Sequence, residues 1–252
     1  RLDIPLSVLP ELQANIFALT HGPAVPDGIY ALFDIGGGTM DGSFFRLERS
    51  NGTRQVEVIR AIVDPYGCEV VKNKLSKGFG NGERMYSSAV IENILFTGDH
   101  HPHYDPRINS SLTDPIYKHV AEIVHGGRRA TMGDPAWRMN TFNFILCGGG
   151  AFYEWYHVAI EHTYLDRNLR RCGIPRFQKF AIPEPGEDFQ YNSLKTAELP
   201  RFFLAYGLSF PEEDHHQVIG FPEHYPELSP VYRDTMTERW NRLNEWYGEA
   251  DV

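Results

Sequence analysis

Two short, predominantly apolar runs stand out along the chain, and each is followed by three consecutive glycines. They cover residues 29–35, before glycines 36–38, and residues 141–147, before glycines 148–150. A predominantly apolar run of this length is typical of a strand that is buried on both of its faces. The pattern therefore predicts two central, neighbouring strands that each end in a glycine turn.

The remaining pattern predicts further strands and helices around this pair. Residues 42–47 and 55–63 are strand-like, and the Asn51-Gly52 pair between them is a strong signal for a β-hairpin. Apolar residues at helical spacing predict helices at 6–19, 68–75, 113–124, 153–171 and 197–208, and residues 176–182 are predicted as another strand. Residues 90–96 are apolar and compatible with either type. A loop is predicted at 97–112, an irregular surface segment from residue 210, and an amphipathic helix at 232–247.

The first glycine turn carries the residue types of a phosphate and magnesium site. The strand ends at Asp34 and Ile35, three glycines follow, and Thr39 and Asp41 come directly after them. Glycine backbone approaches a phosphate closely and binds it through N–H groups. Carboxylates suit hydrated Mg²⁺ and can orient a water for attack on a terminal phosphate. The alternative is a plain glycine hairpin between two strands, but such a turn has no need for two carboxylates beside a small hydroxyl. The turn is neither a Walker A loop nor a dinucleotide-binding fingerprint.

The second turn has the same form, because an apolar strand again runs into glycines and then into a predicted helix. Glycine backbone at such a turn can lie flat against a nucleoside, and the start of a helix favours an anion. Taken alone, this turn is the weaker signal of the two.

Together the two turns resemble the nucleotide-binding motifs of the actin-like ATPase superfamily, which includes actin, heat-shock chaperone ATPases, plasmid-segregating actin-like proteins and sugar kinases. Asp34-Ile35-Gly36-Gly37-Gly38-Thr39-Met40-Asp41 is similar to its second phosphate motif, and Gly148-Gly149-Gly150-Ala151 to its adenosine motif. Residues 10–14, 64–67 and 204–208 are more loosely similar to the helix that crosses between the lobes, the turn entering the outer subdomain and the closing helix. The resemblance spans residues 9–208 and is closest in style to chaperone-like and plasmid-segregation proteins.

The resemblance implies an α/β fold in which a ribonuclease-H-like mixed sheet is flanked by helices and carries an inserted smaller subdomain. Residues 1–65 and 136–210 would form the core of the second lobe, 66–135 the outer subdomain, and 211–252 a C-terminal wrap with the amphipathic helix. The first phosphate loop of the superfamily, an Asp-x-Gly-Thr hairpin, is not found in the 252 residues. The chain is therefore expected to be the C-terminal lobe, with its partner, the N-terminal lobe, missing from it.

The resemblance also implies ligands and roles for the two turns. The expected cofactors are ATP and Mg²⁺, with ATP or ADP held between two lobes. Asp34 is expected as the catalytic residue and as a magnesium ligand through water. The expected nucleotide-binding residues are Gly36, Gly37, Gly38, Thr39, Asp41, Gly148, Gly149, Gly150 and Ala151.

Two departures from the superfamily pattern bear on catalysis and on base recognition. Leu9 precedes Pro10 where chaperones have a glutamate, and Glu11 and Gln13 are the nearby polar alternatives. The Lys and Arg that clasp adenine in chaperones have no match in this sequence.

Composition narrows the range of partners and compartments. The chain is 42% hydrophobic, as folded proteins usually are, and its net charge of −9 is spread along the sequence. An acidic excess argues against nucleic acid or an anionic membrane as the main partner, and no apolar run approaches the ~20 residues of a membrane helix. Three widely spaced cysteines, Cys68, Cys147 and Cys172, fit a reducing cytoplasm better than a disulfide framework, so a cytoplasmic location is predicted.

For the other groups of residues that could form a binding site, we prefer an ordinary structural role. The run Asp99-His100-His101-Pro102-His103-Tyr104-Asp105 has the residue types of a zinc or nickel site, but a solvated loop is favoured, as it is for residues 212–216. Arg128 and Arg129 either face the cleft or, preferably, belong to an exposed turn. The terminal helix, with Trp240 and Trp246, either docks a partner or packs on its own domain.

The sequence thus predicts the Mg-ATP-binding C-terminal lobe of an actin-like or chaperone-like ATPase. We expect negligible ATP hydrolysis by this chain alone, and the activity of the full protein is left open. The alternative is a non-catalytic scaffold or regulatory protein that keeps the fold without hydrolysing ATP. Chaperone, kinase and filament-forming homo-oligomer outputs all remain compatible with the resemblance.

Overall fold

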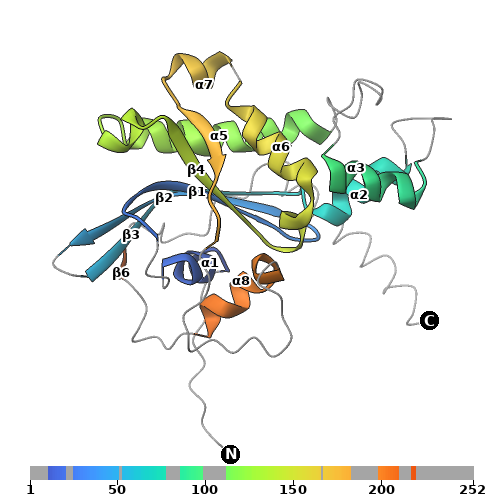
Figure 1. Ribbon diagram of the computed structural model, residues 1–252, viewed down its shortest axis with the longest axis horizontal. Coiled ribbons are helices and arrows are strands. Elements are labelled where there is room, and N and C mark those ends of the chain that lie inside the picture. The colour runs from blue at the N-terminus through green and yellow to red at the C-terminus, as the bar shows by residue number, and fades with distance from the viewer. Residues whose placement is uncertain are drawn as a thin grey trace, which may run out of the picture.

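The computed structural model describes residues 11–20, 25–50, 53–77, 86–98, 112–165, 167–182, 198–209 and 217–219. These residues form a six-stranded sheet in the order β5-β4-β1-β2-β3-β6, with helices on both of its faces (Figure 1). The strands are β1 (Gly28–Ile35), β2 (Met40–Ser50), β3 (Thr53–Asp64), β4 (Thr141–Cys147), β5 (Arg176–Lys179) and β6 (Gln217–Ile219).

The described helices come before β1 and between β3 and β6 along the chain. They are α1 (Glu11–Thr20), α2 (Cys68–Lys77), α3 (Ser88–Thr97), α5 (Asp114–Ala130), α6 (Glu154–Thr163), α7 (Arg167–Arg171) and α8 (Leu199–Leu208), with two 3₁₀ turns, η2 (Pro135–Arg138) and η3 (Gly149–Phe152). Among the described residues, no helix is both long and apolar enough to cross a bilayer.

The strand pairing is that of a ribonuclease-H-like sheet. β1, β2 and β3 form an antiparallel meander, while β4 pairs parallel to β1, and β5 pairs parallel to β4. The order β3-β2-β1-β4-β5 with these directions confirms the predicted α/β fold class. The short strand β6 adds a parallel edge next to β3.

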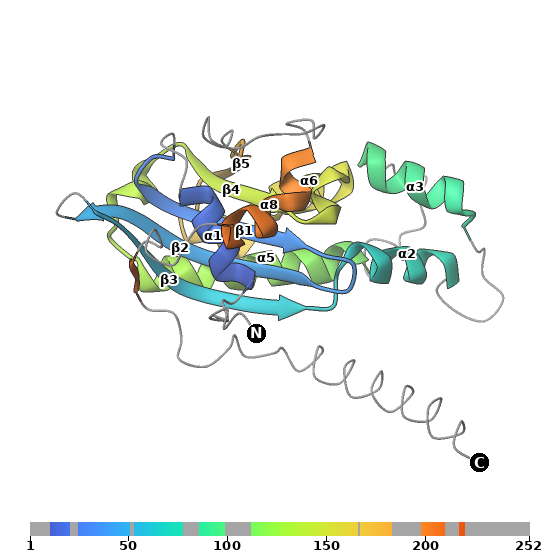
Figure 2. The same ribbon diagram turned by 90° about the horizontal axis from the view of Figure 1, so that it is seen from below.

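The sheet lies between two layers of helices, and this explains the two predominantly apolar runs. Alternate residues of β1 point to opposite faces. Ala31 and Phe33 join the core under α5 and α6, whereas Tyr30 and Leu32 join the core under α1 and α8. Figure 1 shows α5 and α6 on one face and α1 and α8 on the other, and Figure 2 shows α2 and α3 extending beyond one end of the sheet.

Most predicted elements are found, and three differ from the prediction. The undecided segment 90–96 is helical in α3. The helix predicted at 113–124 continues to Ala130 through two glycines. Gly127 is needed for packing and does not end the helix, because a Cβ at this position would come within 2.2 Å of the ring of Phe44. The single helix predicted at 153–171 is wrong, because α6 ends at Thr163 and a separate helix, α7, begins at Arg167.

The predicted division into core, inserted subdomain and C-terminal wrap stays a prediction. α5 lies within the segment predicted as the insertion, yet its residues Ile116, Val120, Ile123 and Val124 are fully buried in the core against the sheet. The histidine-rich loop, residues 212–216 and the terminal helix predicted at 232–247 lie outside the described residues.

Candidate functional site

The two glycine turns lie side by side because β1 and β4 are neighbouring parallel strands. Asp34, near the end of β1, pairs with Cys147, the last residue of β4. A Cβ on Gly148 would lie 2.3 Å from Oδ1 of Asp34, so the second turn packs directly on the first strand end. Gly148 also has a φ of +78°, a backbone conformation that favours glycine. The topology therefore brings the two predicted motifs together at one end of the sheet.

The carbonyl groups of the first turn are held by the beginning of α2. The main-chain N–H groups of Gly67, Cys68 and Glu69 donate to the carbonyl oxygens of Gly38, Gly36 and Gly37, at 3.3, 2.9 and 2.9 Å. A Cβ on Gly67 would lie 2.5 Å from the Gly37 carbonyl oxygen, so this close approach depends on glycine at position 67.

The N–H groups of the same turn consequently point away from α2. In a trans peptide unit the C=O and the following N–H lie on opposite sides of the C–N bond. The carbonyls of glycines 36–38 accept hydrogen bonds from residues 67–69, so the N–H bonds of Gly37, Gly38 and Thr39 are directed the opposite way. The Thr39 nitrogen itself lies against Gly67, where a Cβ would come within 2.5 Å of it. Among the described contacts none of these three N–H groups has a main-chain acceptor. They form a row of adjacent donors of the kind that binds an anion.

The first-turn glycines are needed neither for backbone conformation nor for packing inside this chain. None of them has a positive φ, and a Cβ on Gly38 would meet nothing within 4 Å. The nearest atoms to a Cβ on Gly36 or Gly37 lie at 3.6 Å, an ordinary contact distance. A plain hairpin turn in this conformation would accept other residues.

The second turn combines structural glycines with one open position. A Cβ on Gly150 would lie 2.2 Å from Cγ2 of Ile35, whereas a Cβ on Gly149 would meet nothing within 4 Å. The Gly148 N–H donates to the carbonyl of Pro200 at the start of α8, at 2.9 Å, and the Ala151 N–H donates to the Gly148 carbonyl at 3.3 Å. The amide of Ala151 is therefore used within the turn itself.

Two aspartates stand beside the first turn on the α1 and α8 side of the sheet. Asp34 of β1 and Asp41 of β2 are directly opposite each other in the antiparallel pair. Residues so paired share one face, with their Cβ atoms about 5 Å apart. One oxygen of Asp41, Oδ1, is buried and has no hydrogen-bond partner.

Burial and nearby carboxylates raise the pKa of both aspartates. Burial is the main cause for Asp41, the Asp34 carboxylate adds to it, and a hydrogen bond with the Thr39 side chain offsets part of it, so that the pKa of Asp41 rises to about 7. The pKa of Asp34 is also raised, by burial and by Glu11, against a lowering hydrogen bond from Asn15. A cation bound beside two such carboxyl groups would favour their ionised forms, so this place is suited to cation binding.

Asn15 is a site residue that the sequence did not suggest. Its Nδ2 donates to Oδ2 of Asp34 at 2.6 Å, its Oδ1 has no partner, and the residue is only 1% exposed. The loose similarity of residues 10–14 to a crossing helix indicated that this segment approaches the site. No periodicity indicates that an asparagine one turn further along α1 reaches the strand end.

The other residues considered from the sequence lie away from the exposed part of the turns. Cys147 is fully buried, and burial together with Asp34 and Asp41 raises the pKa of its thiol well above the usual range. The prediction of a turn at Arg128 and Arg129 is wrong, since both belong to the last turn of α5, and the guanidinium of Arg128 lies 5.0 Å from the ring centre of Trp137. Within the part of the chain that is described, no group of three or more metal-ligating side chains converges.

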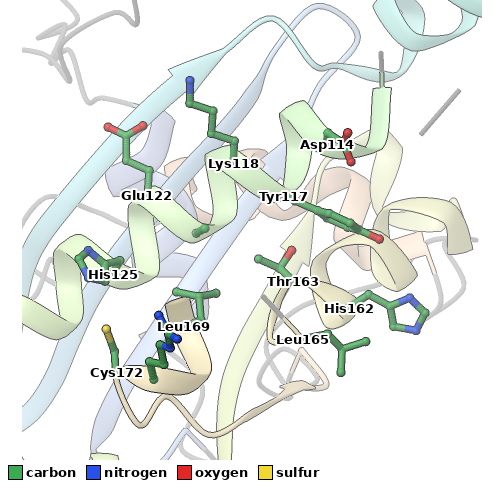
Figure 3. Close-up of a pocket in the computed structure, with 12 residues that line it drawn as sticks. Asp114, Tyr117, Lys118, Glu122, His125, His162, Thr163, Leu165, Leu169 and Cys172 are labelled. Carbon is green, nitrogen blue, oxygen red and sulfur yellow. The ribbon is translucent and has the colours of Figure 1, made fainter. Parts of the chain in front are cut away.

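A cavity of about 1110 Å³ lies between α5 and the segment from α6 to α7 (Figure 3). Tyr117, Lys118, His125, Leu165 and Cys172 are among the side chains that line it. None of the predicted site residues borders this cavity, so it is separate from the glycine turns.

Comparisons with known proteins give similarity to solved structures only. No profile of a known protein family matches the chain, and no curated protein sequence matches it. The chain is similar to a PilM-PilN type IV pilus biogenesis complex (13% identity, TM-score 0.45, 81% of this chain and 52% of that one). It is also similar to the ethanolamine utilization protein EutJ from Carboxydothermus hydrogenoformans (17% identity, TM-score 0.38, 79% and 53%).

The chain thus spans about half the length of these two structures. The fold of the present chain is assigned on its own strand order and pairing, which are those of a ribonuclease-H-like sheet.

Proposed function

We propose that this chain is the nucleotide-binding second lobe of an actin-like ATPase, which holds Mg-ATP or Mg-ADP against its two glycine turns. The phosphates bind along the N–H groups of Gly37, Gly38 and Thr39. Adenosine lies against the second turn, where Gly149 leaves the backbone open. Asp34 and Asp41 face the hydrated magnesium ion.

The observation that carries this proposal is the first turn itself. Its glycines are required neither by φ nor by packing, yet its N–H groups form a row of donors without main-chain acceptors. Glycine that the fold does not need is explained by the close approach of a ligand to the backbone. The same turn in a plain hairpin has no use for three such residues.

The donor set beside the turn fits a hydrated magnesium ion. Hard carboxylate oxygens are the usual protein ligands of Mg²⁺, which keeps several waters. The buried, unpartnered Oδ1 of Asp41 and the raised pKa of both aspartates indicate a place where a cation is favoured. A bound Mg²⁺ supplies charge neutralisation for the phosphates. Asn15 orients the carboxylate of Asp34 through a hydrogen bond, and the Thr39 side chain is hydrogen-bonded to Asp41.

The proposal is tested by a nuclear magnetic resonance titration of this chain with Mg-ADP at millimolar concentration. We expect shifts of the amide signals of residues 36–39 and 148–151, and their loss in the variants Gly38→Val and Gly149→Val. Both positions have room for a side chain, so the variants should keep the wild-type melting temperature. Ala130→Val, at the exposed end of α5, is the matched control and should bind as the wild type does.

An unchanged spectrum on addition of Mg-ADP would favour the alternative, a scaffold that keeps the fold without binding nucleotide. Binding that survives in both glycine variants would remove the two turns as the binding surface.

A further inference from the structure

A buried histidine lies behind the first glycine turn, on the opposite side of the sheet from Asp34. His119 of α5 has a side chain that is 0% exposed, and its Nδ1 lies 2.7 Å from Oδ2 of Asp64. Its ring stands beside Phe33 and Tyr66, with ring centres 6.3 Å away in both cases. The pair joins the middle of α5 to the last residue of β3.

Asp64 is connected to the glycine turn through a few residues. It pairs across the sheet with Met40, which directly follows Thr39. Its carbonyl accepts a hydrogen bond from the N–H of Tyr66 at 2.9 Å, and Gly67 comes next. The N–H groups of residues 67–69 then hold the three glycine carbonyls of the turn. A shift of Asp64 is therefore passed on to the peptide units whose N–H groups face the ligand.

A packing role alone does not account for a histidine at this position. Its second ring nitrogen, Nε2, is buried without a hydrogen-bond partner. A buried polar atom left in that state costs about 1–3 kcal/mol. The sheet makes room for this ring, since a Cβ on Gly42 would lie 2.8 Å from Nε2. Leucine would fill the space without that cost, so what histidine adds is the Nδ1 contact with Asp64.

We propose that His119 is a positioning residue for the phosphate-binding turn. Its bond to Asp64 fixes the junction between β3 and α2, and this junction in turn fixes the orientation of the glycine 36–38 peptide units. The part that concerns phosphate rests on the proposed function, whereas the control of the junction does not.

The first experiment measures amide hydrogen exchange in the whole chain and needs no ligand. In His119→Leu we expect the amides of Gly67, Cys68 and Glu69 to exchange at least about 10-fold faster, because the local opening that exposes them becomes easier. Val124→Ala removes buried volume from the same helix, away from Asp64, and is the control for general destabilisation. His119→Asn keeps an amide donor near the Nδ1 position and should restore part of the protection.

The second experiment compares ligands with and without phosphates. His119→Leu should weaken binding of Mg-ADP about 10-fold and leave binding of adenosine unchanged, because only the phosphates contact the turn; a 10-fold change corresponds to about 1.4 kcal/mol. Equal weakening of both ligands would overturn the role in phosphate binding.

The two experiments separate the failure of this inference from the failure of the proposed function. Unchanged exchange at residues 67–69 in His119→Leu, or equal acceleration in Val124→Ala, would overturn the positioning role. A wild-type chain that does not bind Mg-ADP would remove the proposed function and the phosphate part with it. The exchange rates would still decide whether His119 holds the start of α2.

Discussion

Asp41 makes the folded chain sensitive to pH, because the fold holds its carboxyl group in a place that disfavours charge. Its pKa rises from an ordinary 3.8 to about 7. The folded state therefore binds this proton more tightly than the unfolded state does. The corresponding stability is present below pH 4 and is lost as the pH rises through 7. The full shift corresponds to at most about 4 kcal/mol, and to less here because the side chain is only partly buried.

We predict that Asp41→Asn stabilises the chain at pH 8 by roughly 1–3 kcal/mol relative to the wild type, with a much smaller effect at pH 4. The physical reason is that asparagine has no charge to bury as the pH rises. Urea denaturation of both proteins at the two pH values measures the difference. Glu48→Gln, at an exposed position of β2, is the control and should behave as the wild type does. The same difference in stability at both pH values would show that the charge of Asp41 is not responsible.

At the scale of single residues, the sequence predicted the site residues that lie close together along the chain. It missed the residues that reach the site from distant segments. Asp34 and Asp41 flank the same short turn, so their proximity follows from a hairpin. Asn15 and His119 come from separate helices on opposite faces of the sheet, and they hydrogen-bond to Asp34 of β1 and to Asp64 of β3, respectively. Contacts of this kind depend on the orientation of a whole helix, which local periodicity does not contain.

At the scale of elements, the contact between α1 and α8 depends on a single small residue. A Cβ on Gly207 would lie 1.8 Å from the carbonyl oxygen of Ala14, so the helices approach until their backbones touch. This contact lies in the segment whose Ala-Tyr-Gly resembles the closing helix of chaperone ATPases. It also supports the candidate site, because α1 carries Asn15 and the carbonyl of Pro200, at the start of α8, accepts a hydrogen bond from the Gly148 N–H.

We predict that Gly207→Ala destabilises the chain by about 1–3 kcal/mol, because the added methyl group forces the two helices apart. Leu208→Ala changes the next residue of α8, which is 52% exposed, and should cost less than about 0.5 kcal/mol. Chemical denaturation of the two variants and the wild type provides the comparison. Equal stability of Gly207→Ala and the wild type would mean that the two helices are free to move apart at no cost.

Elements were predictable where a local signal matched their burial. β1 and β4 are largely buried, and their predominantly apolar runs indicate it directly. The hairpin between β2 and β3 follows from Asn51-Gly52. The segment at 90–96 was ambiguous because a short apolar run fits either a strand or a helix. Residues 164–166, after α6, contain no glycine or proline, so no local sequence signal marks the end of that helix. Leu169 of α7 packs into the core, where it is 2% exposed.

At the scale of the whole molecule, the described residues offer only one wall of the proposed nucleotide site. All of the groups proposed to bind nucleotide and magnesium lie at one end of a single sheet, on the ends of β1, β2 and β4. In the actin-like fold, by resemblance, a second sheet supplies the opposing phosphate loop. Phosphoryl transfer depends on positioning and on charge stabilisation around the phosphate, and a single wall supplies only part of each.

We therefore predict that this chain alone binds Mg-ATP weakly, with a dissociation constant of about 1 mM or above, and that it releases phosphate no faster than a protein-free control. A dissociation constant of 1 mM corresponds to about 4 kcal/mol of binding free energy, which is reasonable for a few N–H contacts on an open surface. Calorimetry and a phosphate-release assay on the pure chain measure both quantities. We expect no turnover because one open wall cannot exclude water from the reacting phosphate. Micromolar binding or measurable turnover would mean that the site is already complete in these residues.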